Sequence, residues 1–524
     1  MRGILKLVLM ALMVMACSKE GPSSCRDLDY DFGKELAHEK IVLGERLENP
    51  YKTQNITKAL ETLYPTKSDR VDIKTTDLYV RFLPVSQAEY DTLSSMGLRL
   101  TDHPLDYSIA VEGDWYHDPE IPEGDVTWQY AVVPADFVFP DIHHEIIDEC
   151  YLSENDAATR SSDGIDWDEV ERQAYILTGN ADMLEPQTKA AKSVRPKGRI
   201  TIVDKHFNKG RAIGVAGVQV SCNSFVKFDD TYTDEDGYYE MSKKYNTDLR
   251  YRLIFKNREG FSIGFNLILV PASVSTLGKA PASGINMTVT KDSEDKLFKR
   301  CAANNAVYDY MGRCSGSDLD ITPPPAGLRL WLFHNLNASS AVLLHHGAVL
   351  NKDLIKSFLG EYASLVRIFL PDLTIGVKNA DDYRDIYSTT CHELAHASHF
   401  AEVEQDYWDE YIHYIIESFI TSGGMTYGNG SGTRAGYCEV GEMWAYYLES
   451  LIYKERYGGG FPTFGNSYWF KPEIFRYLDD RGFTCGEIFS VLDEDVDSRK
   501  ALERALIAEF PTRRTQIEQA FDKY

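Results

Sequence analysis

The 524-residue sequence has little positive charge and little cysteine, and it lacks the composition of fibrous or disordered chains. Lys and Arg total 55 against 80 Asp and Glu, which gives a formal net charge of −25. Because a surface this acidic repels phosphate groups, nucleic acid is excluded as an expected partner. The 43% hydrophobic and 26% charged residues are typical of globular proteins and exclude collagen-like and polytopic membrane classes. The length predicts several domains.

The nine cysteines are too sparse for a fold held together by disulfide bonds, and none belongs to a CxxC pair. Without such pairs, the sequence offers no thiolate zinc knuckle and no thioredoxin-like site. Cys301 and Cys314 could close a short loop, although spacing alone does not give disulfide connectivity.

The first seventeen residues are typical of a secretion signal. An apolar run from Ile4 to Ala16 follows Arg2; it is too short to span about 30 Å of hydrocarbon but suits a signal peptide. The run ends at Cys17, and the stretch from Val14 to Cys17 resembles the lipobox of bacterial lipoproteins. This resemblance implies acylation of Cys17 and a lipid-anchored outer-membrane protein, at the cell surface or facing the periplasm. The alternative is an ordinary secretory signal with a chance cysteine.

Two segments without a catalytic motif follow the signal. Residues 18–29 are polar and predict a tether, similar to the export signals of Bacteroidetes surface lipoproteins. Residues 30–190 predict an α/β or α+β domain of unknown role, which could be a propeptide, a binding unit or a spacer. Within this domain, 77–84 predicts a strand and 86–96 a helix. The His-His-Glu stretch at 143–145 is interpreted as a surface group rather than a metal site.

Residues 198–290 predict an all-β domain. The pattern resembles the carboxypeptidase regulatory-like, transthyretin-type β-sandwich, in which a tight turn precedes an aromatic-rich strand; here that turn lies at 233–239. Gly237 can supply the positive φ that such a turn needs. Asp234 and Asp236 could also be calcium ligands, but turn chemistry explains them without a metal.

Residues 295–524 predict an α+β domain in which a short sheet precedes long helices. Strands are expected at 328–333, 341–345 and 366–369, and a helix at 353–362. The chemistry of the chain is concentrated in the helices that follow.

The motif HExxH occupies positions 392–396 of a helix predicted from Asn379, as its N-cap, to at least Phe400. On that helix, His392 and His396 lie one turn apart on one face, so both imidazoles can bind one zinc ion. Glu393 lies beside such an ion, where its carboxylate can act as general base toward a water molecule. A buried helix with ordinary hydrogen-bonded histidines is the alternative.

A catalytic zinc ion needs a third protein ligand. The metzincin spacing HExxHxxGxxH is not met, because His399 replaces its glycine and Glu402 its last histidine. His399 lies about 10 Å along the helix from His392, too far for the three histidines to share an ion. A place on the helix surface or on a cleft wall is therefore expected for His399.

A helix predicted at 438–457 carries acidic residues that could complete the site. It resembles the third-ligand helix of gluzincin peptidases, with matches at Glu442, Trp444, Ala445, Tyr447 and Glu449. Glu442 and Glu449 lie two turns apart on one face, so Glu442 can bind the metal while Glu449 accepts the second N–H of a ligand histidine. Glu439, one turn before Glu442, is the alternative ligand.

The sequence does not decide which residue would donate the hydrogen bond that stabilises an oxyanion. Four candidates are conceivable: Tyr446, Tyr447, His413 and Arg434. Tyr447 is taken as the catalytic candidate because it matches the gluzincin pattern. The glycine-rich stretch at 421–432, which lengthens the connection between the two helices, could form a lid.

These motifs predict a zinc metallopeptidase of gluzincin type that hydrolyses extracellular proteins or peptides and is tethered to a membrane by its lipid. The rival interpretation is a surface binding or adhesion lipoprotein whose zincin-like domain is a degenerate scaffold. Glu393 separates the two, because a scaffold has no need of a carboxylate between two ligand histidines.

Overall fold

The structure, a computed structural model, describes residues 40–524 with several gaps. The gaps are 67, 69–70, 123–125, 157–163, 185–192, 265–273, 294, 317–318, 335–338, 342, 344–345, 347–370, 423–426 and 460–468. The predicted signal peptide, Cys17 and the tether lie outside the described residues. Within them, no helix is both long and apolar enough to cross a bilayer.

In its described residues, the N-terminal unit contains a three-stranded sheet of order β4-β2-β5, a two-stranded sheet β1-β3, and the α-helices α3, α4 and α5. Its elements are β1 Val42–Arg46, α3 Thr53–Leu63, β2 Asp77–Phe82, α4 Gln87–Ser95, β3 Tyr107–Val111, β4 Gln129–Pro134, β5 His144–Cys150 and α5 Trp167–Leu177. The predicted strand at 77–84 and helix at 86–96 are confirmed as β2 and α4. The Ser86 hydroxyl caps α4 by accepting from the Glu89 N–H at 3.2 Å.

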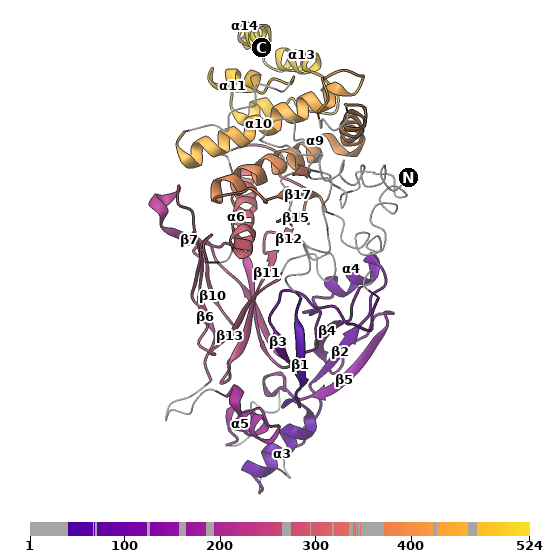
Figure 1. Ribbon diagram of the computed structural model, residues 1–524, viewed down its shortest axis with the longest axis vertical. Coiled ribbons are helices and arrows are strands. Elements are labelled where there is room, and N and C mark those ends of the chain that lie inside the picture. Colours follow the sequence, from indigo (N-terminus) through magenta and orange to yellow (C-terminus); the bar gives the residue numbers. More distant parts are fainter. Residues whose placement is uncertain are drawn as a thin grey trace.

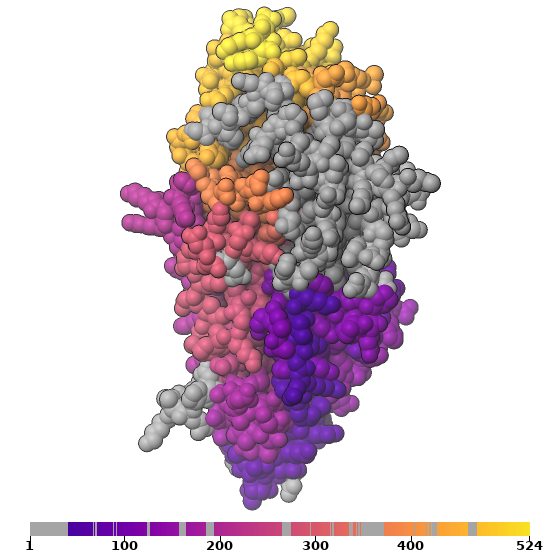
Figure 2. Space-filling model, viewed as in Figure 1, coloured from indigo at the N-terminus to yellow at the C-terminus, as the bar shows by residue number. Residues whose placement is uncertain are grey.

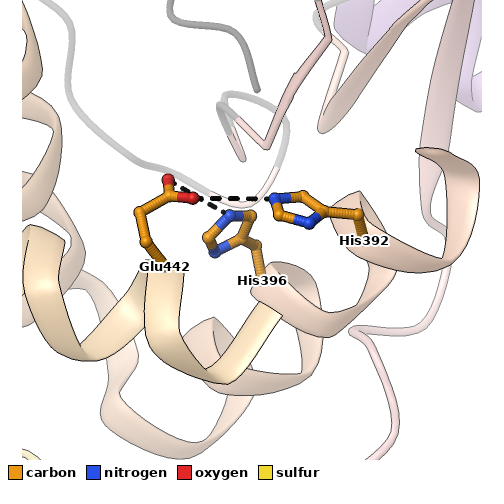
Figure 3. Close-up of side chains that lie close together, drawn as sticks. All are labelled: His392, His396 and Glu442. Carbon is orange, nitrogen blue, oxygen red and sulfur yellow. Dashed lines mark ion pairs between the residues drawn. The ribbon is translucent and has the colours of Figure 1, made fainter. Parts of the chain in front are cut away.

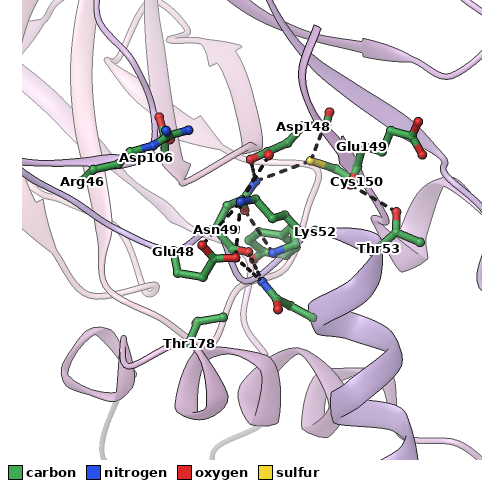
Figure 4. A network of polar contacts seen from close by, with 12 residues as sticks. Arg46, Glu48, Asn49, Lys52, Thr53, Asp106, Asp148, Glu149, Cys150 and Thr178 are labelled. Atoms are coloured by element: carbon green, nitrogen blue, oxygen red, sulfur yellow. Dashed lines mark hydrogen bonds and ion pairs between the residues drawn. The ribbon is translucent and has the colours of Figure 1, made fainter.

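A partly buried polar network joins the segment before α3 to the edge strand β5 (Figure 4). The Asn49 amide donates to Asp148 at 3.3 Å, and the Lys52 ammonium lies 3.3 Å from both Asp148 and Glu48. On the same strand, the His144 ring stacks on Phe139 with centroids 4.2 Å apart. These are structural contacts, and 143–145 contributes no residue to a metal cluster among the described residues.

Two sheets with a common core follow in the chain. One has the order β10-β6-β14, with β7 beside β6; the other contains β13, β11, β8 and β9. The strands are β6 Lys197–Val203, β7 Ala212–Gly214, β8 Val218–Ser224, β9 Lys227–Tyr232, β10 Tyr238–Glu240, β11 Leu249–Asn257, β12 Ser262–Ile263, β13 Val274–Ala280 and β14 Met287–Val289. Because buried apolar residues of both sheets belong to one cluster, they form a packed pair of layers.

The turn before β10 is explained by glycine and aspartate chemistry. Gly237 has φ +79°, and a Cβ at this position would lie 1.9 Å from the Ile200 carbonyl oxygen. The Asp234 carboxylate accepts from the Tyr238 N–H at 2.8 Å. The Asp234 side chain thus takes part in closing the turn, as turn chemistry predicts.

The larger sheet continues into the C-terminal unit. Strand β12 pairs with β11 through Ser262 and, in parallel, with β15 through both of its residues, and the sheet then extends through β17 to β16. One apolar core correspondingly runs from Ile200 to Ala520. The two units predicted on either side of residues 290–295 therefore share a sheet and a core.

The C-terminal unit consists of short strands followed by helices. Its elements are α6 Asp295–Ser315, β15 Arg329–Phe333, β16 Ser340–Ala341, β17 Leu373–Gly376, α9 Tyr383–Ser422, α10 Ala435–Tyr457, α11 Glu473–Asp479, α12 Cys485–Phe489, α13 Arg499–Glu509 and α14 Arg514–Lys523. The strand predicted at 328–333 is confirmed as β15, and the one predicted at 341–345 overlaps β16 at Ala341, while residues 342, 344 and 345 lie outside the described residues. The helix predicted at 353–362 and the strand at 366–369 lie outside the described residues.

The predicted start of α9 needs correction, and the pairing of Cys301 with Cys314, which the sequence left open, is answered. Helix α9 begins at Tyr383 rather than after Asn379, and the Asp382 carboxylate accepts from the Arg384 N–H at 2.8 Å at its start. Cys301 and Cys314 are buried free thiols and do not form a disulfide bond.

The molecule is elongated, with the N-terminal unit beside the β-sheets and the long helices stacked at the opposite end (Figures 1 and 2). Ion pairs connect the N-terminal unit to the rest: the Arg300 guanidinium of α6 lies 2.7 Å from Asp114, and the Lys227 ammonium of β9 lies 2.8 Å from Glu171. Both Arg300 and Lys227 are buried, so removing the acidic partner of either would leave an uncompensated buried charge.

Candidate metal centre

Helices α9 and α10 carry the candidate site and are held together beside it. The Trp444 indole of α10 donates to the Ala395 carbonyl oxygen of α9 at 3.1 Å, between the two histidines of the HExxH motif. Trp444 and Ala395 are both fully buried. This hydrogen bond fixes the register of one helix against the other, which positions the acidic face of α10 opposite the histidines.

His392, His396 and Glu442 form a buried cluster in which the three side chains point toward one another (Figure 3). The Glu442 carboxylate lies 3.5 Å from His396 Nε2 and 3.7 Å from His392 Nε2. Two atoms that each lie 2.0–2.1 Å from a tetrahedral ion are about 3.4 Å apart. The spacing and the donor types of this cluster therefore fit a metal ion such as zinc.

The orientation of His392 is fixed from behind by Glu449. The Nδ1 atom of His392 lies 3.1 Å from the Glu449 carboxylate, which also accepts a hydrogen bond from the Ser388 hydroxyl. Because a carboxylate only accepts, Nδ1 carries the proton and Nε2 keeps its lone pair toward the cluster. The predicted role of Glu449 behind a ligand histidine thus has the required geometry.

Charges at the cluster favour a deprotonated ligand set. Burial alone would raise the pKa of the Glu442 carboxyl, but His396 and His392 outweigh burial and hold that pKa well below its usual range. Burial lowers the pKa of His396, although Glu442 opposes this effect. A carboxylate beside neutral imidazole is the form in which these residues bind a metal.

Tyr411 is a member of the site that the sequence analysis missed. Its hydroxyl donates to Glu442 at 2.6 Å, and its ring lies 5.7 Å from the His396 ring. In a straight helix, 15 residues would separate positions 396 and 411 by about 22 Å. Helix α9 therefore bends sharply between Phe400 and Tyr407 and brings its second half back to the cluster.

The two neighbouring tyrosines of α10 face different ways. The Tyr446 ring lies 4.6 Å from the His392 ring, at the cluster. The Tyr447 ring packs on Phe475 of α11, with centroids 5.8 Å apart, and burial together with Cys485 raises its pKa. Tyr447, the predicted catalytic tyrosine, thus faces α11 and α12, and Tyr446 occupies the position beside the histidines.

The other sequence candidates lie apart from the cluster. Glu439 forms an ion pair with Arg499 at 3.2 Å and is absent from the group that could hold a metal. His413 is exposed, and Arg434 pairs with Glu410. The ion pairs of Glu439 and Arg434 and the exposure of His413 do not bring these side chains to His392 and His396. Neither His413 nor Arg434 therefore gains support as an oxyanion donor.

His399 is buried, contrary to its predicted place on a helix surface or cleft wall. It packs against Tyr407 at 5.3 Å and Trp408 at 6.1 Å, and both ring nitrogens lack a hydrogen-bond partner among the described residues. Burial, with His396 nearby, lowers the pKa of His399 to about 3. The neutral ring therefore serves as packing at the bend of α9.

The described part of the predicted lid is held in place. The Tyr427 carbonyl oxygen accepts from the Tyr414 hydroxyl at 3.0 Å and from the Trp469 indole at 2.9 Å. These hydrogen bonds connect residues 427–432 to α9 and to the segment before α11. Residues 423–426 lie outside the described residues.

No known protein family matches this sequence, and comparisons with curated proteins and with solved structures find no match either.

Proposed function

We propose that this protein is a zinc-dependent metallopeptidase. The observation that carries the proposal is the buried group of His392, His396 and Glu442, with Glu393 between the two histidines in the chain. Two imidazoles and one carboxylate are a donor set typical of catalytic zinc in peptidases, because three protein ligands leave one coordination position open. The gluzincin-like pattern of α10 supports the same assignment.

The residues have distinct roles in this proposal. His392, His396 and Glu442 would hold the metal, and Glu449 would orient His392 through its Nδ1–H. Zinc, when bound, supplies a Lewis acid that polarises the scissile carbonyl and lowers the pKa of water. Glu393, which is fully buried, accepts the proton of the attacking water and delivers it to the leaving amine.

Two tyrosines are placed to assist. The Tyr411 hydroxyl holds Glu442 in position at 2.6 Å, and Tyr446 lies against His392. A phenol beside the cluster can donate a hydrogen bond to the oxygen on which negative charge develops. We therefore assign the oxyanion role to Tyr446 in preference to Tyr447.

The cellular setting is part of the same proposal. The lipobox-like end of the signal implies an outer-membrane lipoprotein anchored through Cys17, and its substrates would be extracellular proteins or peptides. The N-terminal unit and the β-sheets would separate the helices of the site from the membrane.

The decisive experiment compares cleavage by the wild-type protein and by Glu393→Ala. Peptide libraries and labelling of new protein N-termini should show metal-dependent cleavage by the wild type and at least a 100-fold lower rate for the variant, with zinc retained. A control variant, Glu439→Gln, changes an acidic residue of similar burial outside the cluster and should keep activity. Zinc binding without any cleavage in either assay would favour the degenerate scaffold instead.

A further inference from the structure

A cavity of about 310 Å³ lies between the N-terminal unit and one face of the sheet β13-β11-β8-β9. Its floor is formed by alternate residues of neighbouring strands: Arg252 of β11 is paired with Ser221 of β8 and with Thr276 of β13. Its other wall is α4 and the segment 97–103. None of the lining residues belongs to the candidate metal centre. A cavity of this size is in the range of small-molecule sites.

Arg252 is the unusual residue of this cavity. It is only 4% exposed, and its guanidinium makes one hydrogen bond, from Nη2 to the Asn223 amide oxygen at 2.6 Å. The Nε atom of Arg252 has no hydrogen-bond partner among the described residues. In the same part of the chain, the Arg252 guanidinium forms no ion pair with a carboxylate. Burial, and then the neighbouring Arg250, lower the pKa of Arg252 to about 10, so the group stays charged at neutral pH. Burying a cation without a carboxylate partner is costly.

The acidic residues of the lining are already engaged. Asp230 forms an ion pair with Arg99, and Asp114 lies 2.7 Å from the guanidinium of Arg300.

The third carboxylate, Asp102, accepts from the His103 ring at 2.7 Å and from the Tyr116 N–H. Burial lowers the pKa of His103, so this ring donates as a neutral group. Each lining carboxylate thus has its own donors, and Arg252, whose guanidinium carbon lies 5.8 Å from the centre of the Phe228 ring, lines the cavity without a carboxylate partner among the described residues.

We propose that this cavity binds a small organic monocarboxylate with a compact apolar body. The carboxylate would pair with Arg252, whose planar fork suits two parallel hydrogen bonds to such a group. The apolar side chains of the lining would receive the body of the ligand: Ile41, Leu98, Leu100, Phe228, Ile254 and Val274.

Binding can be measured on the purified chain without its signal peptide, using butyrate, hexanoate, 3-phenylpropionate and indole-3-acetate at up to 10 mM. Ligand-observed NMR and calorimetry should detect one-to-one binding of at least one acid, and its amide should bind at least tenfold more weakly. Arg252→Gln should abolish the difference between acid and amide. Leu98→Trp, which fills the cavity and keeps Arg252, should abolish binding. The exposed Arg211→Gln is the matched control and should bind as the wild type does.

Carboxylates also bind zinc, so His392→Ala is included to separate the two sites. Binding that persists in His392→Ala supports the cavity, and binding lost there assigns the acids to the metal centre and overturns the proposal. The proposal is equally overturned if no acid binds, if inorganic phosphate binds more tightly than every acid, or if correctly folded Leu98→Trp binds unchanged. Circular dichroism and the melting temperature establish the folding of each variant.

Discussion

Replacing Glu442 by Gln should remove the metal from this protein, whereas the same change at Glu439 should not. Glu442 has no exposed surface and contacts both histidines, at 3.5 and 3.7 Å. Glu439 lies one turn earlier and is held by Arg499 at 3.2 Å. The pair is a matched test, since both changes convert a mostly buried carboxylate on α10 into an amide of the same shape.

The expected size of the effect follows from the ligand count. Changing a residue behind a metal ligand typically costs 10- to 100-fold in affinity. Loss of one of three direct protein ligands should cost more, about 1000-fold or about 4 kcal/mol. Glu439→Gln should alter zinc affinity by less than tenfold, because it removes only an ion pair with a partly exposed arginine.

Metal loss must be separated from unfolding. The side-chain amide introduced by Glu442→Gln would keep the shape of the glutamate and could still accept from the Tyr411 hydroxyl. The metal-free variant should therefore melt within a few degrees of the metal-free wild type. Competition titration with a zinc indicator gives the affinity, and calorimetry gives the melting temperature. The reasoning fails if Glu442→Gln retains zinc with an affinity within tenfold of the wild type, or if Glu439→Gln is the variant that loses it.

Four further outcomes are expected. Glu449→Gln should weaken zinc binding by about 10- to 100-fold, because the amide keeps one acceptor oxygen where the carboxylate offers two, to His392 and to Ser388; titration of the variant checks this. Tyr446→Phe should lower the peptidase turnover number with zinc retained, whereas Tyr447→Phe should leave it unchanged; equal effects would contradict the assignment. Chelation should lower the melting temperature and added zinc should restore it, as differential scanning calorimetry can show. Cys17→Ala should release the protein from membranes or leave it unprocessed; unchanged detergent partitioning would disprove the lipid anchor.

The parts of the site that were predictable from the sequence depend on local helix geometry. The spacing of His392 and His396 gives one face of a helix, and that relation holds in any α-helix. The same periodicity places Glu442, Tyr446 and Glu449 on one face of α10, with Tyr447 about 140° away from Glu442. The gluzincin pattern pointed to Tyr447, whereas helix geometry points to Tyr446.

The joined sheet was not predictable, because it depends on a very short strand. Ser262 and Ile263 are the whole of β12, yet they pair with β15 and connect the sheets of two predicted units. Two residues carry no usable alternation of apolar and polar side chains, so periodicity cannot detect such a strand. A change of composition along the chain predicts a domain boundary, but here the hydrogen bonds of the sheet continue from one predicted unit into the next.

The bend of α9, which lies at the site itself, was likewise not predictable from local sequence patterns. Residues 401–406 contain neither proline nor glycine, the usual causes of a sharp helix kink. The bend instead coincides with burial of the aromatic rings Tyr407, Trp408 and Tyr411 against the histidine-bearing half of the helix. Tertiary packing thus overrides local propensity there, and it brings the Tyr411 hydroxyl to Glu442 from a position 31 residues earlier in the chain. A residue recruited in this way has no spacing signature, and only the folded arrangement of the two helices reveals it.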